Sequence, residues 1–338
     1  MHEPEERASD ALRRLVDGYQ ASQAIHVAAT LGVADLLVDG PRASEELAEA
    51  CGADPAALYR LLRALATLGV LREQPGRRFA LTALGEPLRS DAPEPVGGWA
   101  AYVGRPSHWR AWGDLLHSVR TGENAFRHAH GSEVWEYRAA RPEEEAVFDR
   151  AMTDGSLAAN ESLLDAYDFA RFAAVVDVGG GRGAFLAALL ARHSEARGIL
   201  FDQPRVVAGA EELLEATGTA DRCRLEGGSF FESVPRGGDA YVLQAVLHDW
   251  EDEQALAILR TCRRAVPDAG VLIVIERELG GPNEDREAKF SDLNMLVGPG
   301  GKERSLEEYG ALFAQSGFRT AGATRTWTGL DIIEATPA

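Results

Sequence analysis

Hydrophobic side chains recur at intervals of three and four through the first 38 residues, and this spacing predicts amphipathic helices. Further along, Ser44 is expected to cap one helix, and Asp54-Pro55 to open a second one that ends at Gly69. Apolar runs at 70–72 and 79–82, separated by a Pro-Gly turn, then predict a β-hairpin. Two helices followed by a hairpin are typical of a winged-helix module.

From residue 174 onward, short apolar runs alternate with helical patterns, which predicts a parallel sheet with helices on both faces. The expected strands cover 175–178, 198–201, 223–226, 240–246 and 270–275, followed by a last pair at 319–327 and 330–335. A long helix is expected over 143–167. Polar or glycine-rich segments follow the first five strands. Open α/β sheets bind ligands outside the carboxyl ends of their strands, so we expect these segments to share one site.

Length and composition narrow the class of protein. A chain of 338 residues is long enough for two domains, and a net charge of −18 disfavours a nucleic-acid partner. The three cysteines are far apart and lack metal-ligand spacing, which favours a reduced, cytoplasmic protein without a bound metal. The N-terminus is acidic and polar, and the longest apolar run, 271–275, is too short to span a bilayer, so we expect no membrane association.

The stretch Val175–Gly183 reads VVDVGGGRG and leads into an apolar helix. Glycines between a strand and a helix let a ligand lie against bare main chain, next to the helix N-terminus. Gly179, Gly181 and Gly183 read as GxGxG, and Gly179, Gly181 and Ala184 also satisfy the GxGxxG/A pattern of dinucleotide-binding folds. Asp177 favours S-adenosylmethionine over NAD, because a carboxylate repels a pyrophosphate but tolerates a sulfonium.

Several residues after the other strands have chemically useful side chains. Asp202 can accept hydrogen bonds from both ribose hydroxyls of an adenosine, and Phe230 can stack on its adenine. His248 lies at the end of the fourth strand and is a candidate general base. A carboxylate such as Glu276 or Glu303, bonded to one ring nitrogen, would leave the other nitrogen able to take a proton. The purely structural alternatives are a helix cap for Asp202 and a packing role for Phe230.

Six motifs in this order resemble the S-adenosylmethionine-dependent O-methyltransferases of the caffeic acid and hydroxyindole type, and the resemblance covers nearly the whole chain. The motifs are Val175–Gly183, FDQP at 201–204, GSFF at 228–231, LHDW at 247–250, Glu276 and GGKER at 300–304. The resemblance implies a Rossmann-like methyltransferase sheet and an N-terminal dimerisation domain. It also implies a bacterial enzyme that modifies aromatic secondary metabolites. The expected domains are a winged-helix-like dimerisation domain at 1–95, a helical linker that contributes to the substrate pocket at 96–165, and the catalytic domain at 166–338.

The resemblance also implies roles for individual residues. His248 would be the general base, flanked by Glu276 and Glu303. The S-adenosylmethionine site would contain Gly179, Gly181, Asp202, Ser229, Phe230, Gln244, Trp250 and Ser156. The acceptor site would contain Met152 and Asn294, with Trp99 and Trp109 as further candidates from an aromatic-rich segment. Two positions depart from the family pattern: Ser229 stands where aspartate is usual, and Gln244 stands where plant members have lysine.

Two other functions remain open at this point. The glycine turn could serve an NAD-dependent oxidoreductase, although Asp177 and the lack of a recognisable second catalytic domain count against it. The winged-helix module could belong to a ligand-sensing regulator that binds DNA. The chain is acidic, and the helix that would be the recognition helix has only two cations, Arg60 and Arg63, which counts against a DNA-binding regulator.

Overall fold

The computed structural model describes residues 7–338, which form two compact units. One unit contains the chain up to Trp109 together with Glu143–Gly155, and the other contains Arg110–Pro142 and Ser156–Ala338. The segment 96–165 is thus divided between the two units. Among the described residues, none of the helices is long and apolar enough to cross a membrane.

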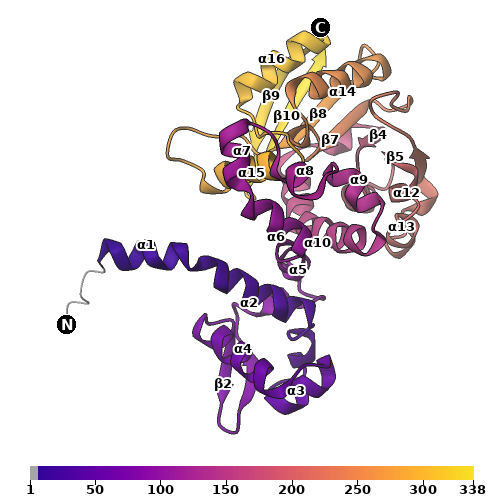
Figure 1. Cartoon of the computed structure of the whole chain (residues 1–338). Coiled ribbons are helices and arrows are strands. Elements are labelled where there is room, and N and C mark those ends of the chain that lie inside the picture. Colours follow the sequence, from indigo (N-terminus) through magenta and orange to yellow (C-terminus); the bar gives the residue numbers. More distant parts are fainter. Residues whose placement is uncertain (1–6) are drawn as a thin grey trace, which may run out of the picture. The chain divides into compact units, whose positions relative to one another are not determined.

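The first unit is mainly helical, with one small sheet (Figure 1). Its elements are α1 (Ala8–Val16), α2 (Gly18–Thr30), η1 (Asp35–Leu37), β1 (Arg42–Ala43), α3 (Ser44–Cys51), α4 (Pro55–Thr67), β2 (Leu71–Gln74), β3 (Arg78–Leu81), η2 (Glu86–Leu88) and α5 (Gly97–Val103). The expected order of two helices and a hairpin is present, and β1 adds a third strand beside β3. Asp54 caps α4 as predicted, through a bond from Ala57 N. The prediction for Ser44 was wrong by one position: α3 begins at Ser44, and Glu46 satisfies the preceding Ala43 N–H.

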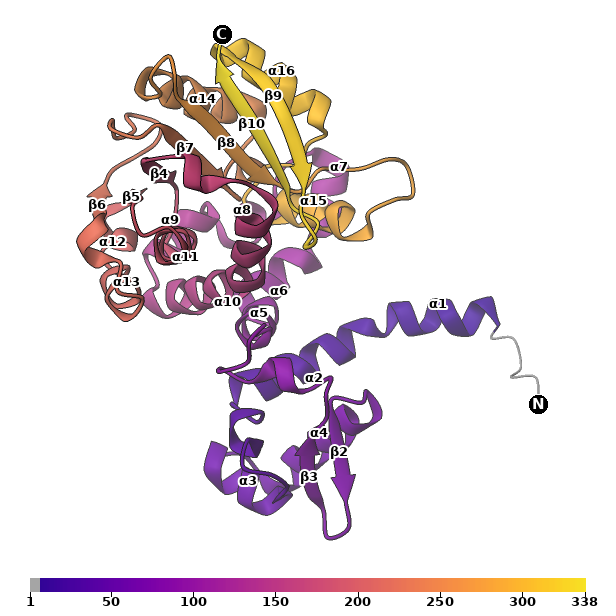
Figure 2. The same cartoon turned by 180° about the vertical axis from the view of Figure 1, so that it is seen from behind.

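The second unit is built on a seven-stranded sheet with the order β6-β5-β4-β7-β8-β10-β9 (Figures 1 and 2). The strands are β4 (Ala174–Val178), β5 (Arg197–Asp202), β6 (Cys223–Gly227), β7 (Ala240–Gln244), β8 (Val271–Glu276), β9 (Phe318–Arg325) and β10 (Asp331–Pro337). The first five run parallel, and β10 pairs antiparallel with both β8 and β9. All seven expected strands are therefore present in this Rossmann-like sheet.

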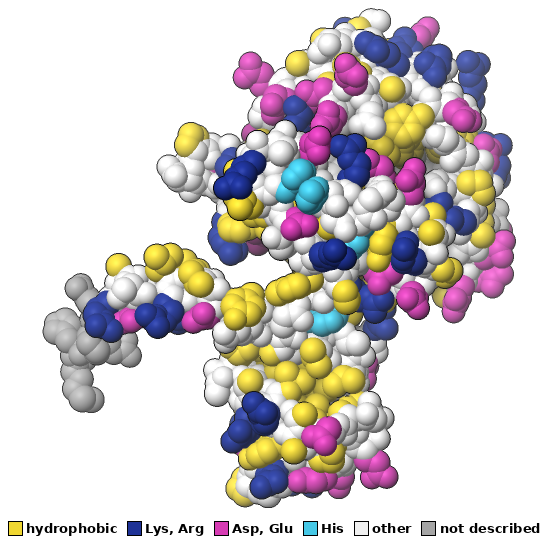
Figure 3. All heavy atoms as spheres, viewed as in Figure 1, with side chains coloured by type: hydrophobic (Ala, Val, Ile, Leu, Met, Phe, Trp, Pro, Cys, Tyr) yellow, Lys and Arg dark blue, Asp and Glu magenta, His cyan; other side chains and the backbone are white. Residues whose placement is uncertain are grey.

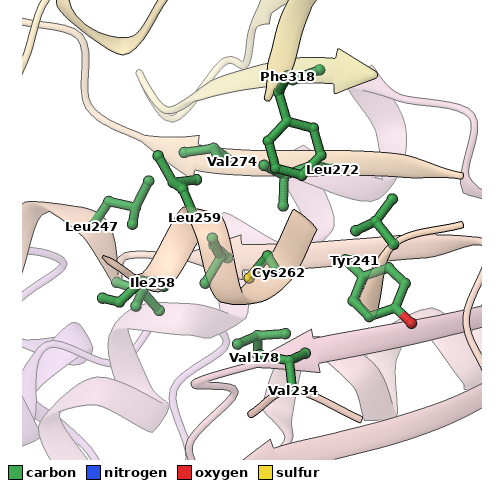
Figure 4. Close-up of a cluster of buried hydrophobic side chains, with 14 of the residues drawn as sticks. Val178, Val234, Tyr241, Leu247, Ile258, Leu259, Cys262, Leu272, Val274 and Phe318 are labelled. Atoms are coloured by element: carbon green, nitrogen blue, oxygen red, sulfur yellow. The ribbon is translucent and has the colours of Figure 1, made fainter. Parts of the chain in front are cut away.

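Helices cover both faces of this sheet. Alternate residues of each strand point to opposite faces, so each strand contributes side chains to the packing on both sides. Val176 and Val178 of β4 pack with α14 (Asp252–Ala265) and α16 (Leu306–Ser316), as Figure 4 shows in part. Val175 faces the other side, where α10 (Pro142–Ala166) and α11 (Ala184–Arg192) lie. The shorter elements on this side and between the strands are η3 (Phe169–Arg171), α12 (Pro204–Val207), α13 (Glu211–Ala216), η4 (Ala220–Arg222) and η5 (Leu247–Asp249).

Further helices precede and follow the central strands. They are α6 (Pro106–Gly113), α7 (Leu115–Thr121), α8 (Ala125–His130), α9 (Val134–Ala139) and α15 (Arg286–Val297). From β4 the chain proceeds outward to β5 and β6, then returns to β7 on the other side of β4. Strand order therefore reverses between β4 and β7, and open α/β sheets bind ligands at such a switch point.

Candidate active site

The glycine turn that follows β4 leaves main chain uncovered at the switch point. Gly179, Gly181 and Gly183 have φ values of +74°, +59° and +78°, a region that side chains disfavour. A Cβ atom at Gly179 would lie 2.9 Å from Val246 Cγ2, so a side chain there would need the neighbouring strand end to move. A Cβ at Gly181 would meet nothing within 4 Å. The turn is thus close-packed on its sheet side and open on the other side.

Asp177 lies beneath this turn and not on its open side. Its carboxyl is 1% exposed, and a Cβ at Gly180 would fall 2.4 Å from its Cγ. Burial, with a contribution from the charge of Asp202, raises the pKa of Asp177 to about 7. At neutral pH this carboxyl is therefore only partly ionised, which weakens the charge argument drawn from it. Its position under the turn still disfavours a second anion above.

Asp202 stands at the carboxyl end of β5, against the turn. Its Oδ2 accepts from Gly181 N at 2.9 Å, and its Oδ1 accepts from Gln203 N at 2.6 Å. Each carboxylate oxygen has a second lone pair that can accept from a ribose hydroxyl. Phe230 lies beside the same turn, with its Cε1 3.5 Å from a Cβ at Gly179. The turn, the carboxylate and an aromatic ring together fit an adenosyl group with a cationic sulfur.

The remaining predicted cofactor residues differ in the contacts that they make. Trp250 stacks edge-on against Phe230, with ring centroids 5.9 Å apart, and it also lies near Trp135. Gln244, the last residue of β7, donates from Nε2 to the buried Asn160 of α10 at 3.2 Å. Ser229 accepts from Phe231 N at 3.3 Å, within its own turn. The predicted Ser156 lies on α10, in the same unit.

The loop that carries His248 is held by a buried carboxylate, Glu276, at the end of β8. Glu276 Oε1 accepts from three successive backbone amides, Val246 N at 3.1 Å, Leu247 N at 2.8 Å and His248 N at 3.3 Å. The strand expected over 240–246 ends at Gln244, because Ala245 has a φ of +52° and turns the chain toward Glu276. Non-glycine residues rarely adopt this conformation, so the loop is strained and held by its contacts.

Two carboxylates face the same nitrogen of His248. Its Nδ1 lies 3.0 Å from Glu303 Oε1 and 3.3 Å from Glu276 Oε2. The side chains of Glu276 and Glu303 are buried, whereas that of His248 is 17% exposed. In the neutral form of the ring, Nδ1 is therefore the nitrogen that donates its proton to Glu303, and the lone pair is on Nε2. Asp249 Oδ1 lies 3.7 Å from Nε2.

Charge and burial oppose each other in this cluster. Burial lowers the pKa of His248, but the charges of Glu276, Glu303 and Asp249 outweigh it and raise the pKa well above its usual value. Burial raises the pKa of Glu276 to about 7. Burial also raises the pKa of Glu303, yet the charge and hydrogen bond of His248 and the Ser291 hydroxyl bring it below its usual value. Glu303 is therefore the ionised partner of the imidazole at neutral pH.

Arg304 is the last residue of the GGKER segment at 300–304, and the sequence predicted no role for it. Its side chain is fully buried, and it donates to the carbonyl oxygens of Leu247 and Trp250, on either side of His248. It also binds Asp252 through Nε and Nη2 at 3.0 and 2.9 Å. Asp252 is the first residue of α14, and its carboxylate accepts both of these bonds. A buried arginine has no signal in hydrophobic periodicity.

The three side chains around His248 Nδ1 also have the donor types of a divalent-cation site. One ligand atom from each of His248, Glu276 and Glu303 lies within 4.8 Å of the other two. Glu276 Oε1 and Glu303 Oε1 are engaged in the hydrogen bonds already described, whereas the buried Oε2 atoms of both residues have no hydrogen-bond partner among the described residues. The expectation of a metal-free site remains a prediction.

Side chains expected at the acceptor site fall into both units. Asn294 of α15 accepts from Trp112 Nε1 at 3.1 Å, beside an apolar cluster that includes Phe126, Trp135 and Tyr137. Met152, Trp99 and Trp109 lie in the other unit. Trp99 is 41% exposed and packs against Tyr102, with centroids 5.6 Å apart.

A Rossmann-like sheet with an open glycine turn, a carboxylate at the end of the neighbouring strand and a histidine paired with buried carboxylates is the arrangement expected of S-adenosylmethionine-dependent methyltransferases. Residues 112–319 match the family model of the O-methyltransferase domain, and residues 13–91 match that of the O-methyltransferase dimerisation domain. The chain therefore belongs to the O-methyltransferase family and is an S-adenosylmethionine-dependent enzyme. The two alternatives, an NAD-dependent oxidoreductase and a DNA-binding regulator, gain no support.

Relatives and solved structures agree with this assignment. The chain is 43% identical over 329 residues to the phenazine O-methyltransferase PhzM of Lysobacter antibioticus, covering 97% of this chain and 96% of the relative. The crystal structure of LaPhzM matches with a TM-score of 0.95 and 42% identity, covering 98% of this chain and 100% of that one. NcsB1, an O-methyltransferase from neocarzinostatin biosynthesis, was solved with S-adenosyl-L-homocysteine and 1,4-dihydroxy-2-naphthoic acid. It matches with a TM-score of 0.79 and 37% identity, covering 94% of this chain and 96% of that one.

Proposed function

We propose that this enzyme methylates a hydroxyl group of a small aromatic secondary metabolite, with His248 as the general base. The observation that carries the proposal is the pairing of His248 Nδ1 with Glu303, which leaves Nε2 as the only ring nitrogen able to accept a proton. The names of the relatives support an aromatic acceptor, since one acts in phenazine methylation and another was solved with a dihydroxynaphthoic acid.

S-adenosylmethionine supplies a methyl group on a positively charged sulfur. The acceptor hydroxyl loses its proton to His248 Nε2 while its oxygen forms the new bond to carbon, and the carbon–sulfur electron pair returns to sulfur. A phenol has a pKa of about 10, so an unassisted hydroxyl is a weak nucleophile at neutral pH. General-base assistance of this kind contributes roughly 10²- to 10⁴-fold. Glu303 holds the ring in the required tautomer and stabilises the imidazolium that forms.

The cofactor contacts follow from the geometry of the turn. We assign the ribose hydroxyls to Asp202 and the methionyl group to the turn at Gly179 and Gly181. Phe230 and Trp250 supply the aromatic surface for the adenine, and Ser229 is placed at its edge. Gln244 and Ser156 complete the predicted cofactor side. Glu276 acts on the base in two ways, by fixing the amides of the loop that carries it and by placing charge 3.3 Å from Nδ1.

For the acceptor side we propose Asn294, whose own unit also contains the aromatic residues Phe126, Trp135 and Tyr137. Met152, Trp99 and Trp109 stay predictions from the sequence. The aromatic rings present flat apolar surface, which suits a planar acceptor. We also propose that the enzyme is a homodimer joined through residues 13–91. Every described residue of α1 is solvent-accessible, and Leu12, Leu15 and Val16 expose 62%, 76% and 65% of their surface. Figure 3 shows hydrophobic side chains along this helix. Sedimentation should show a dimer for the wild-type chain and a monomer for Leu15→Glu.

The proposed reaction is tested with S-adenosylmethionine and a panel of hydroxylated aromatics. The panel contains hydroxyphenazines and hydroxynaphthoic acids, each paired with its methoxy analogue as a control that lacks the reacting hydroxyl. We expect formation of S-adenosylhomocysteine and a methyl ether with hydroxylated members only. Methyl transfer to carbon, or equal turnover of the methoxy controls, would contradict the proposal.

A further inference from the structure

Two hydrogen-bond donors converge on one oxygen of Glu303. His248 Nδ1 lies 3.0 Å from Glu303 Oε1, and the hydroxyl of Ser291 donates to the same oxygen at 2.7 Å. Ser291 belongs to α15, and its neighbour Asp292 accepts from the backbone N–H of Glu303 at 3.0 Å. Adjacent residues of one helix therefore fix both the side chain and the main chain of the carboxylate that supports the base.

The Ser291 hydroxyl changes how strongly Glu303 supports the imidazole. A hydrogen bond donated to an ionised carboxylate stabilises the charged form. The positive end of the hydroxyl dipole lies at Oε1, so it offsets part of the negative charge that His248 Nδ1–H meets. With this hydroxyl removed, Oε1 would carry more charge toward the ring and favour the imidazolium.

We propose that Ser291 is a positioning residue that acts through Glu303 to moderate the basicity of His248 and so sets the lower pH limit of methyl transfer. The inference rests on the proposed function, because it requires His248 to act as the base. Nothing in the hydrophobic pattern of 286–297 distinguishes Ser291 from a surface serine.

Several charged groups act on this pair from the other packed elements. Glu276 from β8 and Asp249 from η5 face His248 directly. Arg277 and Asp292 act on Glu303, while Arg138 of α9 acts on Asp249. All of these groups remain in variants of Ser291. A change in the pH profile of such a variant therefore reports the hydroxyl alone.

The test compares Ser291→Ala with Ser291→Thr, the matched variant that keeps the hydroxyl. The acid limb of kcat/KM against pH is measured at saturating S-adenosylmethionine with one accepted hydroxyaromatic. For Ser291→Ala we expect the limb to move upward by about half a pH unit, which corresponds to about threefold lower kcat/KM on the acid side. The limb of Ser291→Thr should stay with the wild type. The dissociation constant of S-adenosylhomocysteine should be the same in all three proteins.

An acid limb of Ser291→Ala that coincides with the wild type, or moves downward, would overturn the inference. A Ser291→Thr profile that matches Ser291→Ala would do so as well, because side-chain shape and not the hydroxyl would then be responsible. His248→Ala, measured alongside, distinguishes a failure of the role of Ser291 from a failure of His248 as the base. If His248→Ala loses turnover while Ser291→Ala leaves the profile unmoved, only the role of Ser291 fails. If His248→Ala turns over at the wild-type rate, the proposed base itself fails.

Discussion

Glu276 has two separable tasks, and a pair of substitutions separates them. Its Oε1 accepts from three backbone amides, and its Oε2 places charge 3.3 Å from His248 Nδ1. Glu276→Gln keeps an oxygen for the amides but removes the charge. Glu276→Ala removes both. We therefore expect the glutamine variant to fold with little loss of stability and to titrate differently, and the alanine variant to be destabilised.

The expected sizes follow from these distances. Two unit charges 3.3 Å apart interact by about 5 kcal/mol at an effective dielectric constant of 20, equivalent to between 3 and 4 pKa units, roughly. Because the pKa of Glu276 is about 7 and His248 titrates well above its usual range, most of this charge is present when His248 titrates. We expect Glu276→Gln to lower the pKa of His248 by at least about one unit. Each amide that loses its acceptor in Glu276→Ala costs about 1–3 kcal/mol.

The assay for the first expectation is kcat/KM against pH. A base must be neutral to accept a proton, so lowering its pKa extends activity to lower pH, and the acid limb of Glu276→Gln should move downward. The plateau rate should fall, because a weaker base transfers the proton less readily. Urea unfolding of both variants measures the second expectation. The reasoning is refuted if the acid limb of Glu276→Gln stays in place or moves upward, or if both variants unfold alike.

Three further predictions concern the turn, the loop and metal dependence. The pKa of Asp177 is raised from 3.8 to about 7, so the wild-type protein loses stability as pH rises toward 7 and the protonated form is lost. Asp177→Asn should therefore gain stability relative to the wild type between pH 4 and 8, by up to about 4 kcal/mol. A difference in unfolding free energy that does not depend on pH would argue against a buried acid. Ala245→Gly should raise the free energy of unfolding by about 1 kcal/mol, because glycine accepts the φ of +52°, and a loss in thermal denaturation would count against strain there. Dialysis against EDTA should leave kcat unchanged, and restoration of lost activity by a divalent cation would show that the cluster at His248 binds metal.

The sheet was predictable because its strands are short apolar runs bounded by turn residues. The proximity of His248 and Glu276 was also predictable, because both lie at the carboxyl ends of neighbouring parallel strands, at the same edge of the sheet. The ends of the predicted elements were less accurate, because contacts with other segments decide where a strand or helix stops. Ala245 leaves the strand because Glu276 captures the amides that follow it, and a single strand's sequence does not contain that information.

Contacts between segments that are far apart in the chain were harder to predict from the sequence. Arg304 is charged, and its complete burial depends on carbonyl groups 54 and 57 residues away. Ser291 looks like an ordinary helix residue until Glu303 is placed beside it. Trp99 and Trp109 were chosen from a segment dense in aromatic residues, and composition alone does not distinguish a core from a pocket.

The central claim is that His248 removes the proton of the acceptor as the methyl group moves. The most direct measurement is single-turnover methyl transfer by His248→Ala with cofactor and acceptor saturating, alongside calorimetric binding of S-adenosylhomocysteine. The account predicts wild-type affinity for S-adenosylhomocysteine and a rate lower by about 10²- to 10⁴-fold. A single-turnover rate equal to that of the wild type would contradict it.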